Sequence, residues 1–212
     1  MLRYLYGSQL DTYPKLADTM FRDRAAQFKD RLKWDVAVDA QGYERDEYDA
    51  QDPLYVIWQK ADGCHGGSMR FLPTMGPTMV NDHFSGVMDG DTVHSPYIWE
   101  STRFCLSQGS ESRVAAALVL GGIEIGRGFG ITQCVGVFDA RMVRIYRMIG
   151  SCPDILGSSG TGAAKISVGL WTFDPADRVS VLTRARISSA LSEHWYARAF
   201  GDRPAKLLAR AA

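Results

Sequence analysis

Short runs of alternating hydrophobic and polar residues occur along much of this chain, and a period of two is the pattern of half-buried β-strands. The run at Leu2–Tyr6 predicts a first strand. The stretches "LYVIWQK" and "SMRFL" flank "ADGCHGG", whose glycines favour a turn, so together they predict a β-hairpin. Later stretches with the same character predict further strands: "YIWESTRFCL", "ITQCVGVF" and "KISVGLWTF".

Helical patterns separate these strands. The first predicted helix runs to about Arg31, with Asp11 or Thr12 as its N-cap and Pro14 in its first turn. Further helices are predicted at residues 111–122, 140–149 and 177–200, the last opened by "DPAD".

Two segments, 34–52 and 73–96, are rich in turn-forming residues and predict loops, the second long enough to have a function. The resulting order is a strand, a helix, a block of strands and then alternating strands and helices. That order predicts a single α/β domain, residues 1–212, with a mixed sheet between helices.

Charge and cysteine content narrow the function classes. The 24 Lys and Arg residues balance 24 Asp and Glu residues, which argues against non-specific nucleic-acid binding. The four cysteines form no CxxC pair and have no metal-ligand spacing, so we expect no metal site and a reducing, cytoplasmic environment. No stretch has the length of a membrane span or the apolar core of a signal peptide, so we expect no membrane partner.

Two glycine-rich stretches do not match the known phosphate-binding motifs. "GRGFG" lies between a predicted helix and a strand, the reverse of the dinucleotide-binding order. "GSSGTGAAKIS" lacks the Gly-Lys pair of a P-loop and precedes a strand instead of a helix. We interpret both as flexible connections.

The stretch "WESTRFCL" carries two charged residues in a hydrophobic strand. Glu100 and Arg103 point to opposite faces unless a bulge intervenes. A partly desolvated Glu100 would have a raised pKa and could serve as a base near neutral pH. The alternative is that both are ordinary strand charges on a solvated face.

A second group of candidates lies near the N-terminus. Arg24 and Phe28 share one helix face, Trp34 follows the helix, and an acidic loop comes next. One interpretation is an amphipathic helix followed by a solvated loop. The other is a pocket for a cationic, aromatic ligand, in which the rings stack, carboxylates receive an amine or sulfonium, and Arg24 and Arg70 hold a carboxylate.

Eight of these residues occur in the order and with gaps that resemble the acyl-homoserine-lactone synthases, the autoinducer synthases of bacterial quorum sensing. They are Arg24, Phe28, Trp34, Asp46, Asp49, Arg70, Glu100 and Arg103. The motif covers roughly residues 1–150, and Glu44 lies beside its acidic pair.

The resemblance implies a fold similar to the GNAT acyltransferases, with a V-shaped cleft in the sheet. It implies that S-adenosylmethionine (SAM) supplies the amine, and that an acyl thioester on acyl carrier protein or coenzyme A supplies the acyl group, with no further cofactor. It also implies that a segment of about residues 1–50 is mobile and closes over SAM.

Residue roles follow from the same resemblance. Glu100 is the expected general base and Arg103 orients it or holds the donor. Backbone N–H groups near residues 103–105 are expected to stabilise the oxyanion. The residues expected around SAM are Arg24, Phe28, Trp34, Asp46, Asp49, Arg70, Ser101 and Phe104.

The acyl group is expected between the later strands and helices. Candidate lining residues, each of which could instead be plain core, are Trp99, Met75, Met79, Leu118, Gly136, Met142, Ile145, Met148 and Trp171. In this family a hydroxyl-bearing residue near position 136 accompanies 3-oxo chains. Gly136 has none, so the expected acyl group is unsubstituted, branched or aromatic.

Arg141, Arg144 and Arg147 form a basic stripe that could receive an acidic carrier protein, although a solvated helix face or a coenzyme A donor fits as well. Two other classes stay open at this point. One is a GNAT-type transferase acting on another amine, and the other is a binding module without turnover.

Overall fold

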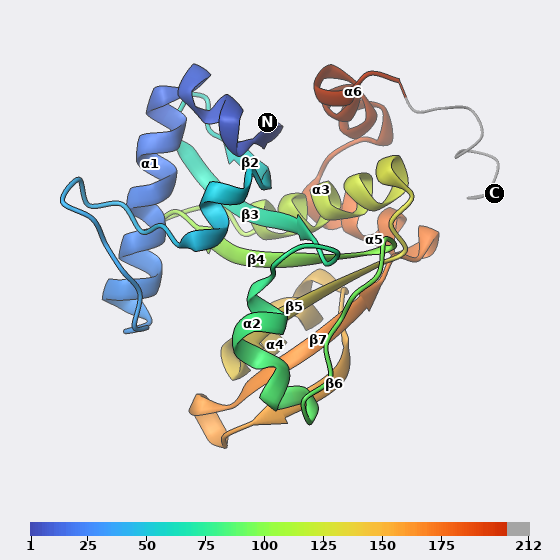
Figure 1. Cartoon of the computed structure of the whole chain (residues 1–212). Helices are drawn as coiled ribbons and strands as arrows, with labels where there is room; N and C mark the ends of the chain where they lie inside the picture. The colour runs from blue at the N-terminus through green and yellow to red at the C-terminus, as the bar shows by residue number, and fades with distance from the viewer. Residues whose placement is uncertain (203–212) are drawn as a thin grey trace.

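Seven strands form one mixed sheet in the computed structural model, which describes residues 1–202 (Figure 1). Across the sheet the strands follow the order β1-β2-β3-β4-β5-β7-β6. Their bounds are β1 Leu2–Tyr6, β2 Leu54–Gln59, β3 His65–Pro73, β4 Ile98–Leu106, β5 Gln133–Asp139, β6 Asp154–Ser159 and β7 Ile166–Thr172. β4 and β5 are parallel and the other neighbours are antiparallel, which confirms the predicted mixed sheet.

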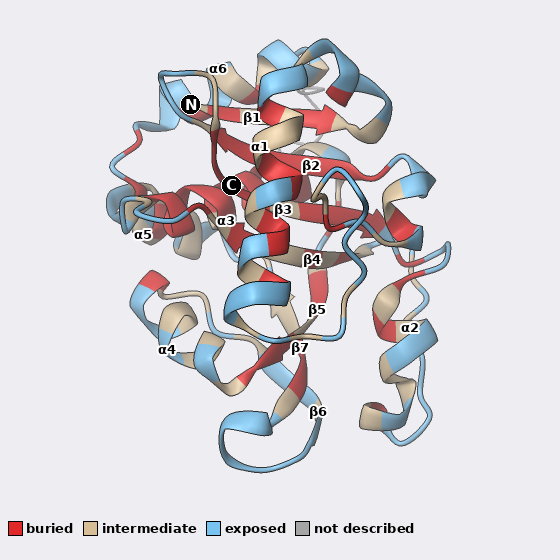
Figure 2. Ribbon diagram, turned by 90° about the vertical axis from the view of Figure 1, so that its left-hand side faces the viewer, coloured by how far each residue is buried: buried red, intermediate tan, exposed pale blue. Residues whose placement is uncertain are grey.

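Helices cover both faces of this sheet. They are α1 Pro14–Ala25, α2 Met79–Phe84, α3 Arg113–Phe129, α4 Ala140–Ile149, α5 Pro175–Ala185 and α6 Ser189–Phe200. Leu54 and Val56 of β2 pack in the core beneath α3, whereas Tyr55 and Ile57 pack beneath α1 on the opposite face. Figure 2 shows this buried layer along the strands. Within residues 1–202 no helix combines the length and apolar character needed to cross a bilayer.

The parallel strands β4 and β5 stay together over only a short distance. Ile98–Glu100 pairs with Gln133–Val135, and no pairing continues beyond Glu100 although both strands extend further. The sheet therefore opens into a V between β4 and β5, as the resemblance implied.

A β-bulge lies in the middle of β4. The register with β3 shifts between Ser68 and Arg70, so that two residues of β4 oppose one of β3. Arg103 lies at this bulge with φ of 53°, a left-handed conformation that costs a non-glycine residue about 1–3 kcal/mol. This is the bulge that Glu100 and Arg103 require if both are to serve one side of the sheet.

The start of the first helix differs from the prediction. Tyr13, not Asp11 or Thr12, precedes the helix, because residues Gly7–Thr12 already form the 3-10 helix η1. At its other end the helix continues as a π-helical segment, η2 (Ala26–Arg31). The expected side-chain cap is therefore wrong, while the expected end near Arg31 is confirmed.

The prediction that "GRGFG" is a flexible connection is also wrong, because α3 continues through it to Phe129. A Cβ at Gly126 would meet the Phe173 ring, and one at Gly128 would overlap the Tyr196 ring. These glycines serve close helix packing instead of ending the helix.

Two further elements differ for tertiary reasons. Strand β6 was not predicted, because its second half belongs to a glycine- and serine-rich stretch that begins at Gly157. Its extended conformation is stabilised by pairing with β7. The single helix predicted over 177–200 is divided into α5 and α6 at Arg186, which has a left-handed φ of 55°. Neither the strand β6 nor the break at Arg186 is indicated by the residues in its own part of the sequence.

Gly121 generates a stability prediction, because a Cβ there would overlap the Val56 side chain of β2. Gly121→Ala should raise helix propensity yet destabilise the protein by about 1–3 kcal/mol through overpacking. Urea unfolding measures the change. Gly86→Ala is the control, since a Cβ at Gly86 meets no atom within 4 Å and should leave stability nearly unchanged. Equal stability of the two variants would contradict the packing argument.

Candidate active site

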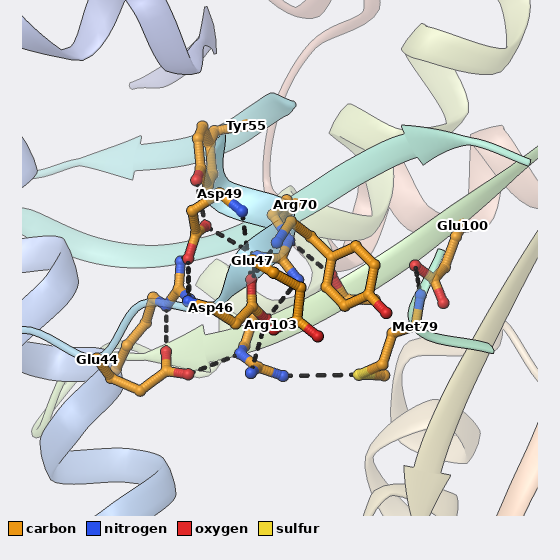
Figure 3. A network of polar contacts seen from close by, with 12 residues as sticks. Glu44, Asp46, Glu47, Asp49, Tyr55, Arg70, Met79, Glu100 and Arg103 are labelled. Carbon is orange, nitrogen blue, oxygen red and sulfur yellow. Dashed lines mark hydrogen bonds and ion pairs between the residues drawn. The ribbon is translucent and has the colours of Figure 1, made fainter. Parts of the chain in front are cut away.

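Three arginines, of which Arg24 and Arg70 are fully buried and Arg103 largely so, form a closed circuit of ion pairs with three carboxylates, called the charge ring below (Figure 3). In order around the circuit, its members are Glu44, Arg24, Asp49, Arg70, Asp46 and Arg103. The arginines come from α1, β3 and β4, Glu44 and Asp46 come from the loop after η2, and Asp49 comes from the 3-10 helix that follows this loop. The ring therefore joins segments that are far apart in the sequence.

Arg24 makes the first half of the circuit. Its Nε donates to Glu44 Oε2 at 2.6 Å, and its two terminal nitrogens donate to the two oxygens of Asp49 at 2.9 Å each. The Tyr55 hydroxyl also donates to Asp49. Such a bidentate arginine–carboxylate pair fixes both the distance between the two groups and the plane in which they lie.

Arg70 and Arg103 close the circuit. Arg70 Nη1 donates to Asp49 Oδ1 at 2.8 Å, and Arg70 Nη2 donates to Asp46 Oδ2 at 2.9 Å. Arg103 then lies 2.7 Å from Asp46 Oδ2 and donates through Nε to Glu44 Oε1 at 3.0 Å. Because positive and negative members alternate in equal number, each buried charge has two opposite neighbours.

The acidic loop is shaped for this arrangement. Asp46 caps the 3-10 helix η3 (Glu47–Gln51) and accepts from the Tyr48 and Asp49 N–H groups, while Asp49 accepts from the Asp46 N–H. These reciprocal hydrogen bonds form a capping box, which helps to fix the orientation of both carboxylates. Burial would raise the pKa of Asp49, but Arg24 and Arg70 outweigh it and hold that pKa well below its usual range.

Two aromatic rings lie beside the charge ring. The Phe28 and Trp34 rings stack with their centroids 5.1 Å apart and their planes 15° apart, and the backbone N–H of Trp34 donates to the backbone carbonyl of Phe28 at 2.9 Å. The guanidinium of Arg103 lies 5.5 Å from the centre of the Phe28 ring. The predicted association of these rings with the charged residues is therefore observed.

The rings face a cavity of about 790 Å³, called the outer cavity. Its lining includes Phe28, Trp34, Glu44, Asp46, Glu47, Tyr48, Met79, His83, Phe84, Met142 and Ile145. Its size is within the range of small-molecule sites, which is roughly 300–1,000 Å³. Carboxylates and aromatic rings in one cavity suit a ligand that is both cationic and flat.

A second, smaller cavity of about 90 Å³, called the inner cavity, lies between the sheet and α3. Its apolar lining includes Met69, Phe71, Val119, Ile123, Trp171 and Phe173. The two cavities share the wall residues Thr102, Arg103, Phe104, Val137 and Tyr146. The shared wall is where β4 and β5 separate, so a polar compartment and an apolar compartment meet at the V.

Glu100 lies outside both linings. Its side chain is 0% exposed, and its oxygens accept from the backbone N–H groups of Met79 at 3.1 Å and Val80 at 2.6 Å. Glu100 is therefore not a solvated strand charge, and it fixes the start of α2. Burial raises its pKa to about 7 despite those two N–H donors.

The structure divides the residues predicted around SAM into two groups. Those that line a cavity are Phe28, Trp34 and Asp46 in the outer one, Ser101 in the inner one and Phe104 in both. The remaining residues, Arg24, Asp49 and Arg70, lie behind the cavity wall. There they bind the protein's own carboxylates and arginines, so a direct contact with SAM stays a prediction for them.

The predicted acyl residues are divided as well. Gly136 and Trp171 line the inner cavity, and Met79, Met142 and Ile145 line the outer one.

The other four predicted acyl residues line neither cavity. Met75 and Met148 are 62% and 63% exposed, Leu118 is buried in the core, and Trp99 packs on Phe129. A methionine or tryptophan in the sequence does not reveal which face its element presents, so contact of these four residues with an acyl chain stays a prediction.

Sequence reasoning did not identify Tyr48, His83 or Tyr146 as wall residues. Tyr48 lies within the acidic motif, between Asp46 and Asp49, which is a signal that could have indicated it. The expected mobility of residues 1–50 also stays a prediction, since β1 pairs with β2 and α1 packs on the sheet.

Asp49→Asn should open the charge ring with little change in volume. Two buried arginines would each lose a partner, which predicts a loss of about 3–5 kcal/mol in the free energy of unfolding. Because the folded pKa of Asp49 is depressed, its contribution is present above its unfolded pKa of about 4 and is lost as pH falls. Thermal unfolding between pH 3 and 7 should therefore show a weaker acid dependence in the variant.

The exposed Asp11 provides the control, and Asp11→Asn should change neither the stability nor its pH dependence. A stability of Asp49→Asn within 1 kcal/mol of wild type, on the scale of an exposed ion pair, would contradict the role given to the charge ring.

Comparison with known proteins agrees with this geometry. The sequence pattern of the family described as autoinducer synthase matches residues 8–181. An acyl-homoserine-lactone synthase of Rhizobium etli is 42% identical over 200 residues, which covers 91% of this chain and 93% of that protein. One from Agrobacterium fabrum is 33% identical, covering 81% of this chain and 84% of that protein.

Solved structures share the fold. The CoA-dependent acyl-homoserine lactone synthase BjaI, with SAM and isopentyl-CoA, has a TM-score of 0.79 at 19% identity and covers 100% of this chain and 98% of its own. The related MesI has a TM-score of 0.78 at 23% identity, covering 90% and 98%. An acyl-CoA N-acyltransferase of Pseudomonas aeruginosa has a TM-score of 0.54 at 11% identity, covering 80% and 98%.

These likenesses confirm the GNAT-like fold class. Because the family pattern spans residues 8–181 and relatives are 42% and 33% identical over most of the sequence, the chain belongs to the autoinducer synthase family.

Proposed function

We propose that this enzyme makes an N-acyl-L-homoserine lactone from SAM and an acyl thioester, and releases methylthioadenosine and the free thiol. One observation carries the proposal: the outer and inner cavities meet at the V between β4 and β5. An amine bound in the first compartment would there face an acyl carbon held in the second.

The outer cavity suits SAM in each of its parts. The stacked Phe28 and Trp34 rings offer a surface for the adenine or the sulfonium. Glu44 and Asp46 place negative charge near the positive sulfonium and ammonium groups, while Arg103 offers donors to the ligand carboxylate. The charge ring holds these groups in place, which is the positioning role proposed for Arg24, Asp49 and Arg70.

The reaction proceeds in two steps that need no oxidant or reductant. First, the deprotonated amine attacks the thioester carbonyl, a C–N bond forms, the C–S bond breaks and the thiol leaves. Second, the carboxylate of the acylated ligand attacks its own γ-carbon, and the sulfonium C–S bond breaks to release methylthioadenosine. Backbone N–H groups at the bulge of residues 103–105 are the proposed donors to the tetrahedral oxyanion. Positioning supplies most of the second step, because it is intramolecular.

Glu100 is the proposed general base for the first step. A pKa of about 7 lets it accept a proton near neutral pH. Its place outside both cavities requires a water molecule as a relay to the amine. Arg103 binds Glu44 and Asp46 instead of Glu100, so we assign Arg103 to substrate binding and not to orienting the base.

The acyl carrier is either an acyl carrier protein or coenzyme A. Arg144 and Arg147 lie exposed on α4 with no ion-pair partner among residues 1–202, whereas Arg141 pairs with Asp139. An acidic carrier protein and the phosphates of coenzyme A both complement such a surface.

The function is tested by incubating the protein with SAM and a panel of acyl-CoA and acyl-carrier-protein thioesters. We expect thiol release that depends on SAM, together with lactone and methylthioadenosine in equal amounts by mass spectrometry. Thiol release that continues without SAM would favour an acyltransferase acting on another amine. No thiol release with any donor would contradict the proposal and favour a binding module.

Glu100→Gln tests the base. If Glu100 is the base, kcat should fall by about 10²–10⁴-fold. Wild-type kcat should rise with pH through about 7, where Glu100 loses its proton, and the variant should lack this limb. Rates measured from pH 5.5 to 9 supply both readouts.

The exposed Glu111 is the control, and Glu111→Gln should keep both the rate and the limb. Near-native turnover of Glu100→Gln with a lower melting temperature would show that Glu100 only holds α2. In that case a water bound to backbone carbonyls becomes the candidate base.

A further inference from the structure

Tyr146 lies at the junction of the two cavities. It projects from α4 and is one of the wall residues common to both linings. Its ring packs edge-on against Phe138 at 5.2 Å and against Trp171 at 5.0 Å between centroids. Because the ring is fixed by these contacts, the hydroxyl has a defined position in the wall.

The Tyr146 hydroxyl makes no hydrogen bond to any residue of 1–202, unlike neighbouring polar groups. The Trp171 Nε1 donates to the Ser151 carbonyl at 3.1 Å, and the Tyr48 hydroxyl donates to Asp82 at 2.8 Å. Tyr146 is only partly buried and lines both cavities, so its hydroxyl is within reach of a ligand bound in them. Burial raises the pKa of Tyr146, which keeps the O–H available as a donor.

A donor in this position affects which acyl chain fits. When a purely hydrocarbon chain fills the cavity, it removes the water from the hydroxyl and offers no acceptor in return. Leaving a buried donor unpaired costs about 1–3 kcal/mol. A site built this way discriminates against a substrate that lacks the matching oxygen.

The neighbouring strand cannot supply such a donor. Gly136 of β5 lines the same cavity, but a Cβ there would lie 2.9 Å from the Ser101 carbonyl oxygen and 3.4 Å from the Trp171 ring. Position 136 therefore has no room for a hydroxyl-bearing side chain. The expectation of an unsubstituted, branched or aromatic acyl group considered position 136 only, whereas α4 brings a hydroxyl to the cavity from another direction.

We propose that Tyr146 is a specificity-determining residue, whose hydroxyl donates a hydrogen bond to an oxygen at C3 of the acyl chain. The preferred donor is then a 3-oxo or 3-hydroxy acyl thioester. This inference rests on the proposed function and names its substrate class. C3 is chosen because the junction places Tyr146 close to the reacting carbonyl, while the bulge N–H groups serve the carbonyl oxygen itself.

The test compares thioesters of equal length that differ only at C3, such as octanoyl, 3-oxo-octanoyl and 3-hydroxyoctanoyl, at saturating SAM. Wild type should prefer an oxygenated donor in kcat/KM by roughly five- to 150-fold, the factor that corresponds to one unpaired buried donor. Tyr146→Phe keeps the ring contacts and should bring the ratio close to one, chiefly through loss on the oxygenated donor. The wild-type ratio tests the inference even if the variant folds poorly.

Tyr97→Phe is the matched control, because Tyr97 is exposed and lines neither cavity, and it should keep the wild-type ratio. A wild-type preference for the unsubstituted chain, or an unchanged ratio in Tyr146→Phe, would overturn the inference. An equal fall on all donors would do so too and would make Tyr146 an oxyanion donor. Lactone formation in any of these cases leaves the proposed function standing, whereas no turnover with any donor overturns both.

Discussion

The charge ring is the interaction on which the rest of the site depends. Three arginines from three separate elements would each be costly to bury alone. Placed in alternation with three carboxylates, they form a neutral unit that ties the loop after η2 to α1, β3 and β4. Phe28 and Trp34 lie next to this unit, and Glu44, Asp46 and Arg103 line the outer cavity, so half of the charge ring shapes the cavity wall directly and the other half supports it from behind.

The sheet supplies the second constraint. A parallel pair that ends after three residues leaves backbone groups free on both strands, and the bulge of β4 turns Arg103 toward the acidic loop. Glycines in α3 let that helix lie close to β2 and to Phe173, which positions the apolar inner cavity behind the V. The polar outer cavity and the apolar inner cavity thus meet where the pairing of β4 and β5 ends, and not at a loop.

Much of this could be predicted from the sequence. Strand periodicity located six of the seven strands, and the ordered motif from Arg24 to Arg103 indicated the family. The motif indicated that its arginines and carboxylates converge, but it did not reveal the closed circuit, because spacing shows which residues come together and not which atoms pair. β6 was missed because its order comes from pairing with β7, and the exposure of Met75 and Met148 was not foreseen because hydrophobicity does not distinguish a cavity wall from core or surface.

Arg103 has a further consequence for protein engineering. Its backbone adopts a left-handed conformation that glycine would accept without strain. Glycine there would also remove the guanidinium that links Glu44 to Asp46. A stabilisation screen that ranks substitutions by backbone conformation would therefore select glycine at position 103. That substitution would relieve backbone strain at the bulge, but it would break the charge ring that organises the catalytic cleft.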